Sequence, residues 1–187
     1  TTVTAQAATL DEMIGDANAV GQGRGQGDSR SAGDGGEGDP DVIPRWERWH
    51  IQFASSSLDA YGEQLDFFGI ELGAMSGGRI EVDYALAFTA NKPHTRRVEG
   101  GDDLRLHFFE PTGKTVDFER QFMKRAGINV ANRVVITFYP KKVEARLAEL
   151  ERVAAAGRPL KEIRKTVFVV QSTTGGYAFT VNQQEFR

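Results

Sequence analysis

The tripeptide Gly113-Lys114-Thr115 is the stretch that comes closest to a phosphate-binding loop, because it lies between a predicted strand and a predicted helix. Such a loop needs a glycine five residues before Gly113, so that backbone N–H groups can surround the phosphates, and that position is Phe108. Glu110 would also place a carboxylate beside the phosphates. We therefore interpret the tripeptide as a turn in which Thr115 caps the following helix.

The three histidines, His50, His94 and His107, could supply acid–base or metal-binding chemistry. They lie on separate predicted elements without the spacing of a zinc motif. If the strands that carry His50 and His107 were neighbours, the two rings could meet, with Asp83 or Glu81 as a third ligand or general acid. A small enzyme or ligand-binding domain that uses His50 and His107 is therefore the alternative hypothesis, and the main one includes no metal or other cofactor.

Two clusters of basic residues could contact nucleic acid, but neither contains the aromatic side chains that single-stranded nucleic acid stacks on. The chain has a net charge of -3, and its part from residue 45 onward is only mildly basic. We therefore expect no nucleic-acid binding. The clusters are Lys92, Arg96 and Arg97, and Arg158, Lys161, Arg164 and Lys165.

Residues 1–44 differ in composition from the rest of the chain. Residues 21–39 consist mainly of Gly, Asp, Ser, Gln and Arg, which cannot bury enough apolar surface to offset the entropy lost on ordering. A single weak helical pattern precedes them at residues 10–14. We predict a flexible, acidic, glycine-rich leader over 1–44 and one domain over 45–187. The absence of cysteine excludes disulfides and thiolate metal sites.

The pattern of apolar residues in 45–187 predicts an α+β domain around a buried central strand at 133–140. We expect a mostly antiparallel sheet of about seven strands, with three helices on one face. A long polar loop is expected over 91–103. The predicted strands cover 49–53, 70–74, 80–88, 104–109, 133–140, 165–171 and 177–186, and the predicted helices cover 58–68, 115–126 and 141–156.

Strand alternation then assigns side chains to faces. We expect Ile80, Val82, Tyr84, Leu86 and Phe88 to line the core under the helices. The opposite face would be open, with an apolar centre and a polar rim, as in a protein-binding surface. The alternative is that the C-terminal hairpin or the 91–103 loop covers this face. Its candidate partner-binding residues are His50, Arg105, His107, Phe109, Val135 and Tyr139.

Several short motifs resemble an uncharacterised bacterial domain that follows an N-terminal membrane segment. They are Trp49-His50-Ile51-Gln52-Phe53 and the segments at 65–73, 126–128, 138–140 and 176–179. The resemblance implies a bacterial envelope or periplasmic setting and supplies no catalytic residues. In layout alone, the chain is similar to accessory proteins of the ExbD and TolR type.

Together, these observations predict a non-enzymatic, tethered domain that binds a protein partner or a second copy of itself. Membrane attachment would come only through an anchor before Thr1.

Overall fold

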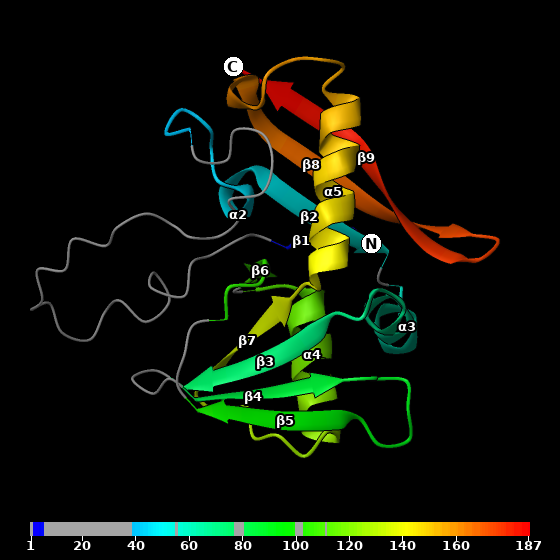
Figure 1. Ribbon diagram of the computed structural model, residues 1–187. Coiled ribbons are helices and arrows are strands. Elements are labelled where there is room, and N and C mark those ends of the chain that lie inside the picture. The colour runs from blue at the N-terminus through cyan, green and yellow to red at the C-terminus, as the bar shows by residue number, and fades with distance from the viewer. Residues whose placement is uncertain (1, 6–38, 55, 77–80, 100–102, 111) are drawn as a thin grey trace, which may run out of the picture.

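A computed structural model describes residues 2–5, 39–54, 56–76, 81–99, 103–110 and 112–187. They form two β-sheets with helices packed beside them, which confirms the α+β class (Figure 1). The strands divide into a four-stranded upper sheet and a five-stranded lower sheet. The single sheet expected from the sequence is therefore wrong, although most strand pairs are antiparallel, as predicted.

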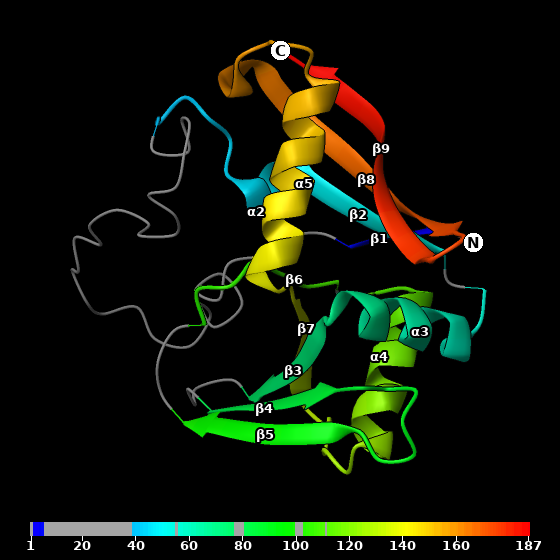
Figure 2. The same cartoon turned by 45° about the vertical axis from the view of Figure 1, so that its right-hand side comes forward.

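The upper sheet has the strand order β1-β2-β8-β9. Its one parallel pair joins β2 to β8, and the other pairs are antiparallel. Helix α5 lies across one face of this sheet in both ribbon views (Figures 1 and 2). The bounds are β1 Thr2–Ala5, α2 Arg45–Arg48, β2 Trp49–Ala54, α5 Lys141–Ala154, a 3-10 turn at Leu160–Glu162, β8 Ile163–Thr173 and β9 Gly176–Phe186.

The lower sheet is antiparallel throughout and has the order β5-β4-β3-β7-β6. Helix α4 packs on β3 and β7, whereas α3 packs on α4 and touches β2 and β9 of the upper sheet, so it joins the two halves. The bounds are α3 Leu58–Phe68, β3 Glu71–Ser76, β4 Glu81–Leu86, β5 His94–Glu99, β6 His107–Phe108, α4 Lys114–Arg125 and β7 Arg133–Phe138.

Two described strands lie where the sequence predicted irregular chain. Strand β5 occupies residues 94–99 of the expected 91–103 loop, and its side chains are almost all exposed, so they show no apolar alternation. Strand β1 lies within the expected leader, and it pairs with β2. The predicted helical pattern at 10–14 and the segment 21–38 lie outside the described residues. From residue 39 the chain is described again, beginning with a turn in which the Val42 N–H donates to the Asp39 carbonyl.

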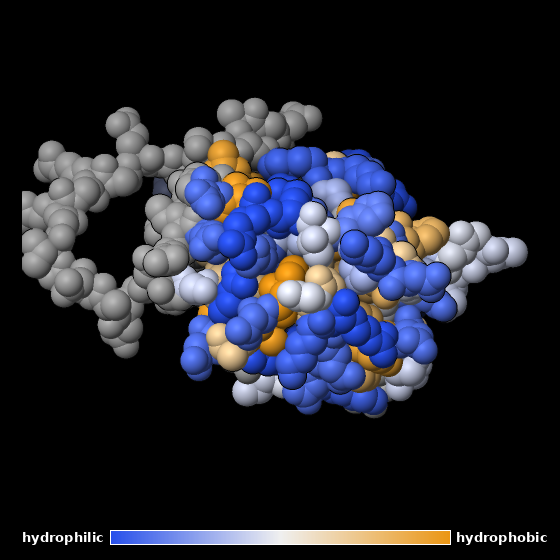
Figure 3. Space-filling view, turned by 90° about the horizontal axis from the view of Figure 1, so that it is seen from below, coloured by the Kyte–Doolittle hydropathy of each residue, from blue (hydrophilic) through white to orange (hydrophobic). Residues whose placement is uncertain are grey.

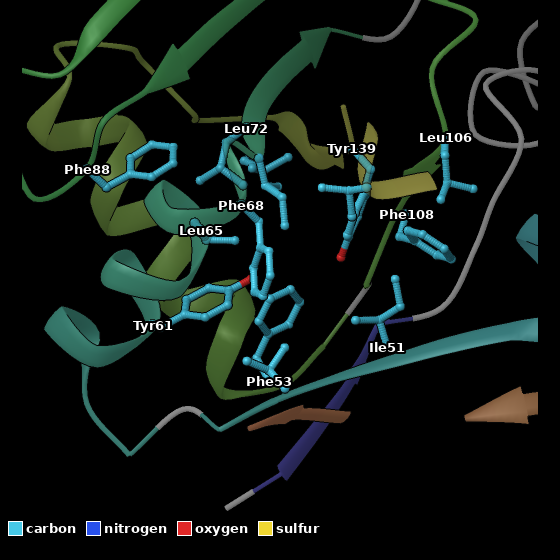
Figure 4. Packing of buried hydrophobic residues seen from close by; sticks show 14 of the residues in the cluster. Ile51, Phe53, Tyr61, Leu65, Phe68, Leu72, Phe88, Leu106, Phe108 and Tyr139 are labelled. Carbon is cyan, nitrogen blue, oxygen red and sulfur yellow. The ribbon is translucent and has the colours of Figure 1, made fainter. Parts of the chain in front are cut away.

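The two sheets share one hydrophobic core. Side chains of β2, such as Ile51 and Phe53, share this core with Phe108 of β6 and with Tyr139, which follows β7, and Phe68 of α3 lies beside Phe53 (Figure 4). A smaller cluster lies on the far face of the lower sheet, where Met75, Val82, Tyr84, Ile136 and Phe138 are buried.

The face predicted for β4 is the wrong one. Ala85 is 1 % exposed in the main core, whereas Val82 and Tyr84 belong to the small cluster on the far face. Phe88 does reach the main core, because Ala87 has a left-handed backbone (φ 65°) that breaks the alternation. The predicted core residue Ile80 lies outside the described part of the chain.

The helices cover the face with the smaller side chains. Ala74 and Ala85 leave room for close packing, and Gly62 of α3 lies so near Phe122 of α4 that an added Cβ would be 2.9 Å from the ring. On β7 the helix-facing residue is Val135, and Ile136 faces away. Alternation therefore predicted correctly which β7 side chains share a face, but the face expected to lie under the helices was the wrong one.

Candidate ligand-binding groove

The six residues predicted to form a partner-binding face do not lie on one face. His50 is in the upper sheet, on β2, and His107 is in the lower sheet, on β6. Val135 and Tyr139 are 5 % and 0 % exposed in the main core, so their expected exposure is wrong. Phe109 is half-buried just after β6. The alternative site that joins His50 to His107 therefore has no geometric support.

Arg105, the remaining member of that set, covers the far face of the lower sheet. Strands β5 and β6 lie at opposite edges of this sheet, and Asp103 and Arg105, which precede β6, contact its far face. The Arg105 guanidinium lies 5.2 Å from the centre of the Phe138 ring, and Asp103 accepts a hydrogen bond of 2.8 Å from the Tyr84 hydroxyl. The alternative, in which the 91–103 loop covers this face, is therefore correct only for Asp103, because Arg105 was predicted to lie in a strand and to be part of the open face.

A network of charges surrounds this crossing. Arg96 lies 3.9 Å from the centre of the Tyr84 ring and donates to Glu71, which Arg105 also contacts. Burial alone would raise the pKa of Glu71, but the hydrogen bonds from these two arginines outweigh it and lower that pKa. Seen from below, this end of the molecule is mainly hydrophilic, with small separate apolar patches (Figure 3). The network therefore acts as a structural cover for the sheet.

The other candidates for chemistry also have structural partners. Asp83 accepts hydrogen bonds from Arg97 and Arg133. Burial lowers the pKa of His50, and the charge of the nearby Lys165 lowers it further.

The glycine-lysine-threonine turn differs from the expectation. Gly113 occupies the N-cap of α4, and Thr115 is inside the helix, where its hydroxyl donates to Glu110 at 3.0 Å. Thr115 therefore does not cap α4.

The interior holds one carboxyl group without a cation as hydrogen-bond or ion-pair partner among the described residues. Glu119 of α4 is 4 % exposed and accepts a hydrogen bond of 2.8 Å from the hydroxyl of Tyr61 on α3. Burial raises its pKa to about 8, and the hydrogen bond from Tyr61 offsets this only in part. Glu119 is therefore largely protonated at neutral pH; it lies between α3 and α4 and does not face solvent.

An open groove lies where α3 ends, α5 begins and β9 begins. Its volume is about 330 Å³, inside the range of roughly 300 to 1,000 Å³ of small-molecule sites. Three local signals position its walls. Gly69 ends α3 in a left-handed conformation (φ 68°), Pro140 precedes the first turn of α5, and a two-residue turn at 174–175 leads into β9.

Four of the eight residues that line the groove are aromatic. Phe68 of α3 stacks on Phe179 of β9 with ring centres 4.1 Å apart, and Phe67 meets the edge of Tyr177 at 5.6 Å. Phe67 is 49 % exposed, and it is one of three large apolar side chains that are exposed among the described residues. The Tyr177 hydroxyl donates to Glu63 at 3.0 Å, so this ring is fixed in place.

Two cations form the opposite rim of the groove. Lys142 and Arg146 are one helical turn apart on α5, both exposed, and both line the groove with Val143 between them. Within the described part of the chain, neither has a carboxylate partner, whereas their neighbour Lys141 is 3.5 Å from Glu144. Lys142 lies in the first turn of α5, at the positive end of the helix dipole. The groove therefore suits an apolar group with an anionic neighbour.

Comparisons of the chain with protein-family models, curated proteins and solved structures find no match, so the family resemblance stays a prediction. No helix in the described ranges is long and apolar enough to span a membrane. Among the described residues, no group of three or more His, Cys, Asp or Glu could hold a metal ion.

Sequence reasoning did not select the groove residues, although one signal was present. Phe67 lies off the apolar stripe of α3, which runs through Leu58, Tyr61, Leu65 and Phe68, so it is a large apolar residue that the helix does not bury. Lys142 and Arg146 carry no such signal, because cations one turn apart on a helix are ordinary on any solvated face.

Gly176 keeps the groove wall in place, so Gly176→Ala should destabilise the protein by about 1 to 3 kcal/mol. Its φ of 128° is unfavourable for any other residue, and an added Cβ would lie 2.3 Å from Phe67 Cε2. Urea unfolding measures the loss. The matched control is Gly175→Ala, which has open space around it and should change stability by less than about 0.5 kcal/mol. Equal losses at the two glycines would contradict the assignment.

Proposed function

We propose that residues 45–187 form a non-enzymatic binding module whose groove holds an apolar side chain of a protein partner beside one of the partner's carboxylates. The observation that carries the proposal is the pair of cations, Lys142 and Arg146, that face an aromatic groove without a described acidic partner. Elsewhere in the described chain, most arginines are ion-paired, as Arg45, Arg96 and Arg133 are. The envelope setting and the membrane tether stay predictions from the sequence.

The aromatic wall and the cationic rim of the groove contribute different amounts of binding free energy. Burying an aromatic side chain against Phe67 and Phe68 is worth roughly 1.5 to 3 kcal/mol. An exposed ion pair to Lys142 or Arg146 adds only about 0 to 1 kcal/mol. The aromatic wall therefore supplies most of the affinity, and the cations select the sign of the ligand's charge.

The test uses a pair of small probes with one ring and opposite charges. The full chain, labelled with ¹⁵N, is titrated with 3-phenylpropionate and with 3-phenylpropylamine, and amide shifts are followed by NMR. We expect 3-phenylpropionate to bind with a Kd of the order of millimolar, as its size allows. The shifts should centre on Phe67, Tyr177 and the first turn of α5. The amine should bind at least about three times more weakly, because its charge repels the two cations.

Removal of the cations should abolish this preference. The double variant Lys142→Ala, Arg146→Ala should bind the two probes equally, while Lys124→Ala, Arg125→Ala, which removes two exposed cations from α4, should bind like the parent. Equal binding of both probes to the parent protein would overturn the charge argument. Shifts that centre away from the groove would overturn the proposed function.

A further inference from the structure

The two sheets have four edges, and β9 is the edge that is open to another strand. Natural proteins protect sheet edges with short strands, charges, prolines or bulges. Strand β6 has two residues and β1 has four, whereas β5 carries Arg96, Arg97 and Glu99. Strand β9 has eleven residues, and among the described residues it pairs only with β8. Of the four edges, β9 therefore has the weakest protection.

The open part of β9 is its first half, residues 176–181. This half reads Gly-Tyr-Ala-Phe-Thr-Val, without a charge or a proline, and it pairs with β8 in unbroken register. The register then shifts, because Val181 and Gln183 face consecutive residues of β8 and Asn182 is extra. A bulge of this kind interrupts regular pairing, which resumes at Gln183. In both ribbon views, no described element lies beside the outer edge of β9 (Figures 1 and 2).

The open edge and the groove are continuous, since Tyr177, Ala178 and Phe179 belong to both. A strand added to residues 176–181 would place alternate side chains toward the helices, about 7 Å apart along the strand. One of them would lie over the groove between Phe67 and Val143. Its neighbours on the same face would approach the rim where Lys142 and Arg146 are exposed.

We propose that the partner binds as an added strand: an extended, acidic segment of another protein pairs with residues 176–181, inserts one apolar side chain into the groove and places a carboxylate beside Lys142 or Arg146. This inference rests on the proposed function of the groove and specifies its partner. Charge complementarity selects an acidic segment, because the groove lining contains two cations and no carboxylate. A second copy of β9 would bring a single carboxylate, Glu185, which already pairs with Arg164.

The probe is the peptide acetyl-Glu-Val-Phe-Val-Glu-amide, in which the phenylalanine and both glutamates share one face of an extended chain. We expect it to bind the full chain at least tenfold more tightly than 3-phenylpropionate does. Binding should slow hydrogen exchange at every second amide of residues 176–181, because one set of N–H groups gains partners in the added strand.

Two N-methylated peptides test the backbone pairing. One is methylated on both valines, and the other on the phenylalanine and the second glutamate. In an added strand, only one of these two sets of N–H groups faces β9. We therefore expect one methylated peptide to lose at least tenfold in affinity while the other binds like the parent peptide. The variant Lys142→Ala, Arg146→Ala should weaken all three peptides and keep this asymmetry.

The outcomes separate the two proposals. If all three peptides bind equally and shift the amide NMR signals of the groove residues, strand addition is wrong and the groove function stands. If 3-phenylpropionate binds and the parent peptide does not, strand addition is also wrong. If no probe binds, both proposals fail. If light scattering shows a dimer that the peptide does not dissociate, a second copy of the chain occupies the β9 edge and the inference is overturned.

Discussion

Replacement of Glu119 by glutamine should stabilise the protein by about 1 to 3 kcal/mol at pH 7, and the gain should grow as the pH rises from 5 to 8. A buried carboxyl group that keeps its proton when folded, and releases it when unfolded, makes folding less favourable at neutral pH. Glutamine has nearly the same shape and no proton to release. It can still accept the hydrogen bond from Tyr61, so its introduction removes the pH effect without opening a cavity.

The direction follows from the pKa values of the two states. The pKa of Glu119 is about 8 in the folded protein, against an ordinary value of 4.5. Below pH 4.5 both states hold the proton, and the group's contribution to stability is fully present. Between pH 4.5 and 8 only the folded state holds it, so stability falls by up to 1.36 kcal/mol for each pH unit, or about 3 kcal/mol at pH 7. Above pH 8 the loss is complete.

Urea unfolding of the parent and of Glu119→Gln at pH 5, 6, 7 and 8 gives the required difference. Subtraction of the two curves cancels other titrating groups, such as His50, whose pKa burial lowers. The matched control is Glu63→Gln, because Glu63 also accepts a hydrogen bond from a tyrosine but is exposed. A gain for Glu119→Gln that is the same at every pH would contradict the buried, protonated state.

The elements were predictable where local patterns are strong. The apolar stripe that runs from Leu58 to Phe68, closed by Gly69, predicted α3 with the bounds that the structure has. Gly127 and Gly157 follow α4 and α5 and have the left-handed backbone that ends helices. Strand β5 was missed because its order comes from backbone pairing with β4 at an exposed edge, and such pairing leaves no mark on side-chain polarity.

The pairing of the strands was harder to predict from the sequence than the elements themselves. Strands β2 and β8 pair in parallel although more than a hundred residues separate them, and no local pattern in either strand selects the other. This pairing creates the upper sheet and places His50 away from His107. Face assignment failed for two reasons. Both faces of β7 are apolar, so alternation groups its side chains but cannot say which group the helices cover. On β4 the more apolar face, with Val82 and Tyr84, is turned away from the helices, and Arg96 and Asp103 contact it.

The groove was the hardest feature to predict because it exists only after packing. Its wall combines the last residues of α3, the first turn of α5 and the first residues of β9. Only Phe67 carried a local signal. The cations became notable once the structure placed Glu144 beside Arg45 and Lys141, and no described carboxylate beside Arg146.

The second large effect concerns the buried ion pair that joins α5 to the upper sheet. Arg48 and Glu151 are each 1 % exposed, and Arg48 donates two hydrogen bonds, of 3.0 and 2.8 Å, to the carboxylate. The same carboxylate accepts from the Trp49 indole at 2.8 Å and from the Thr166 hydroxyl at 2.8 Å. Glu151 therefore links α2, β2, β8 and α5, and it has no access to water if its cation is removed.

We expect Arg48→Met to destabilise the protein by about 3 to 5 kcal/mol, because it leaves the Glu151 carboxylate buried without a cation. Urea unfolding at pH 7 measures this loss. The control is Arg152→Met, one residue further along α5, where the pair with Glu149 is exposed and the loss should stay below about 1 kcal/mol.

The double variant Arg48→Met, Glu151→Leu decides whether the charge or the packing matters. It removes both charges, so it should be more stable than Arg48→Met alone, because an apolar pair of similar volume can replace a buried ion pair. It should remain less stable than the parent by about 1 to 3 kcal/mol, since the Trp49 indole and the Thr166 hydroxyl lose their acceptor. If the double variant is no more stable than Arg48→Met, the loss comes from the missing side-chain contacts of Arg48, and the unpaired charge of Glu151 is not its cause.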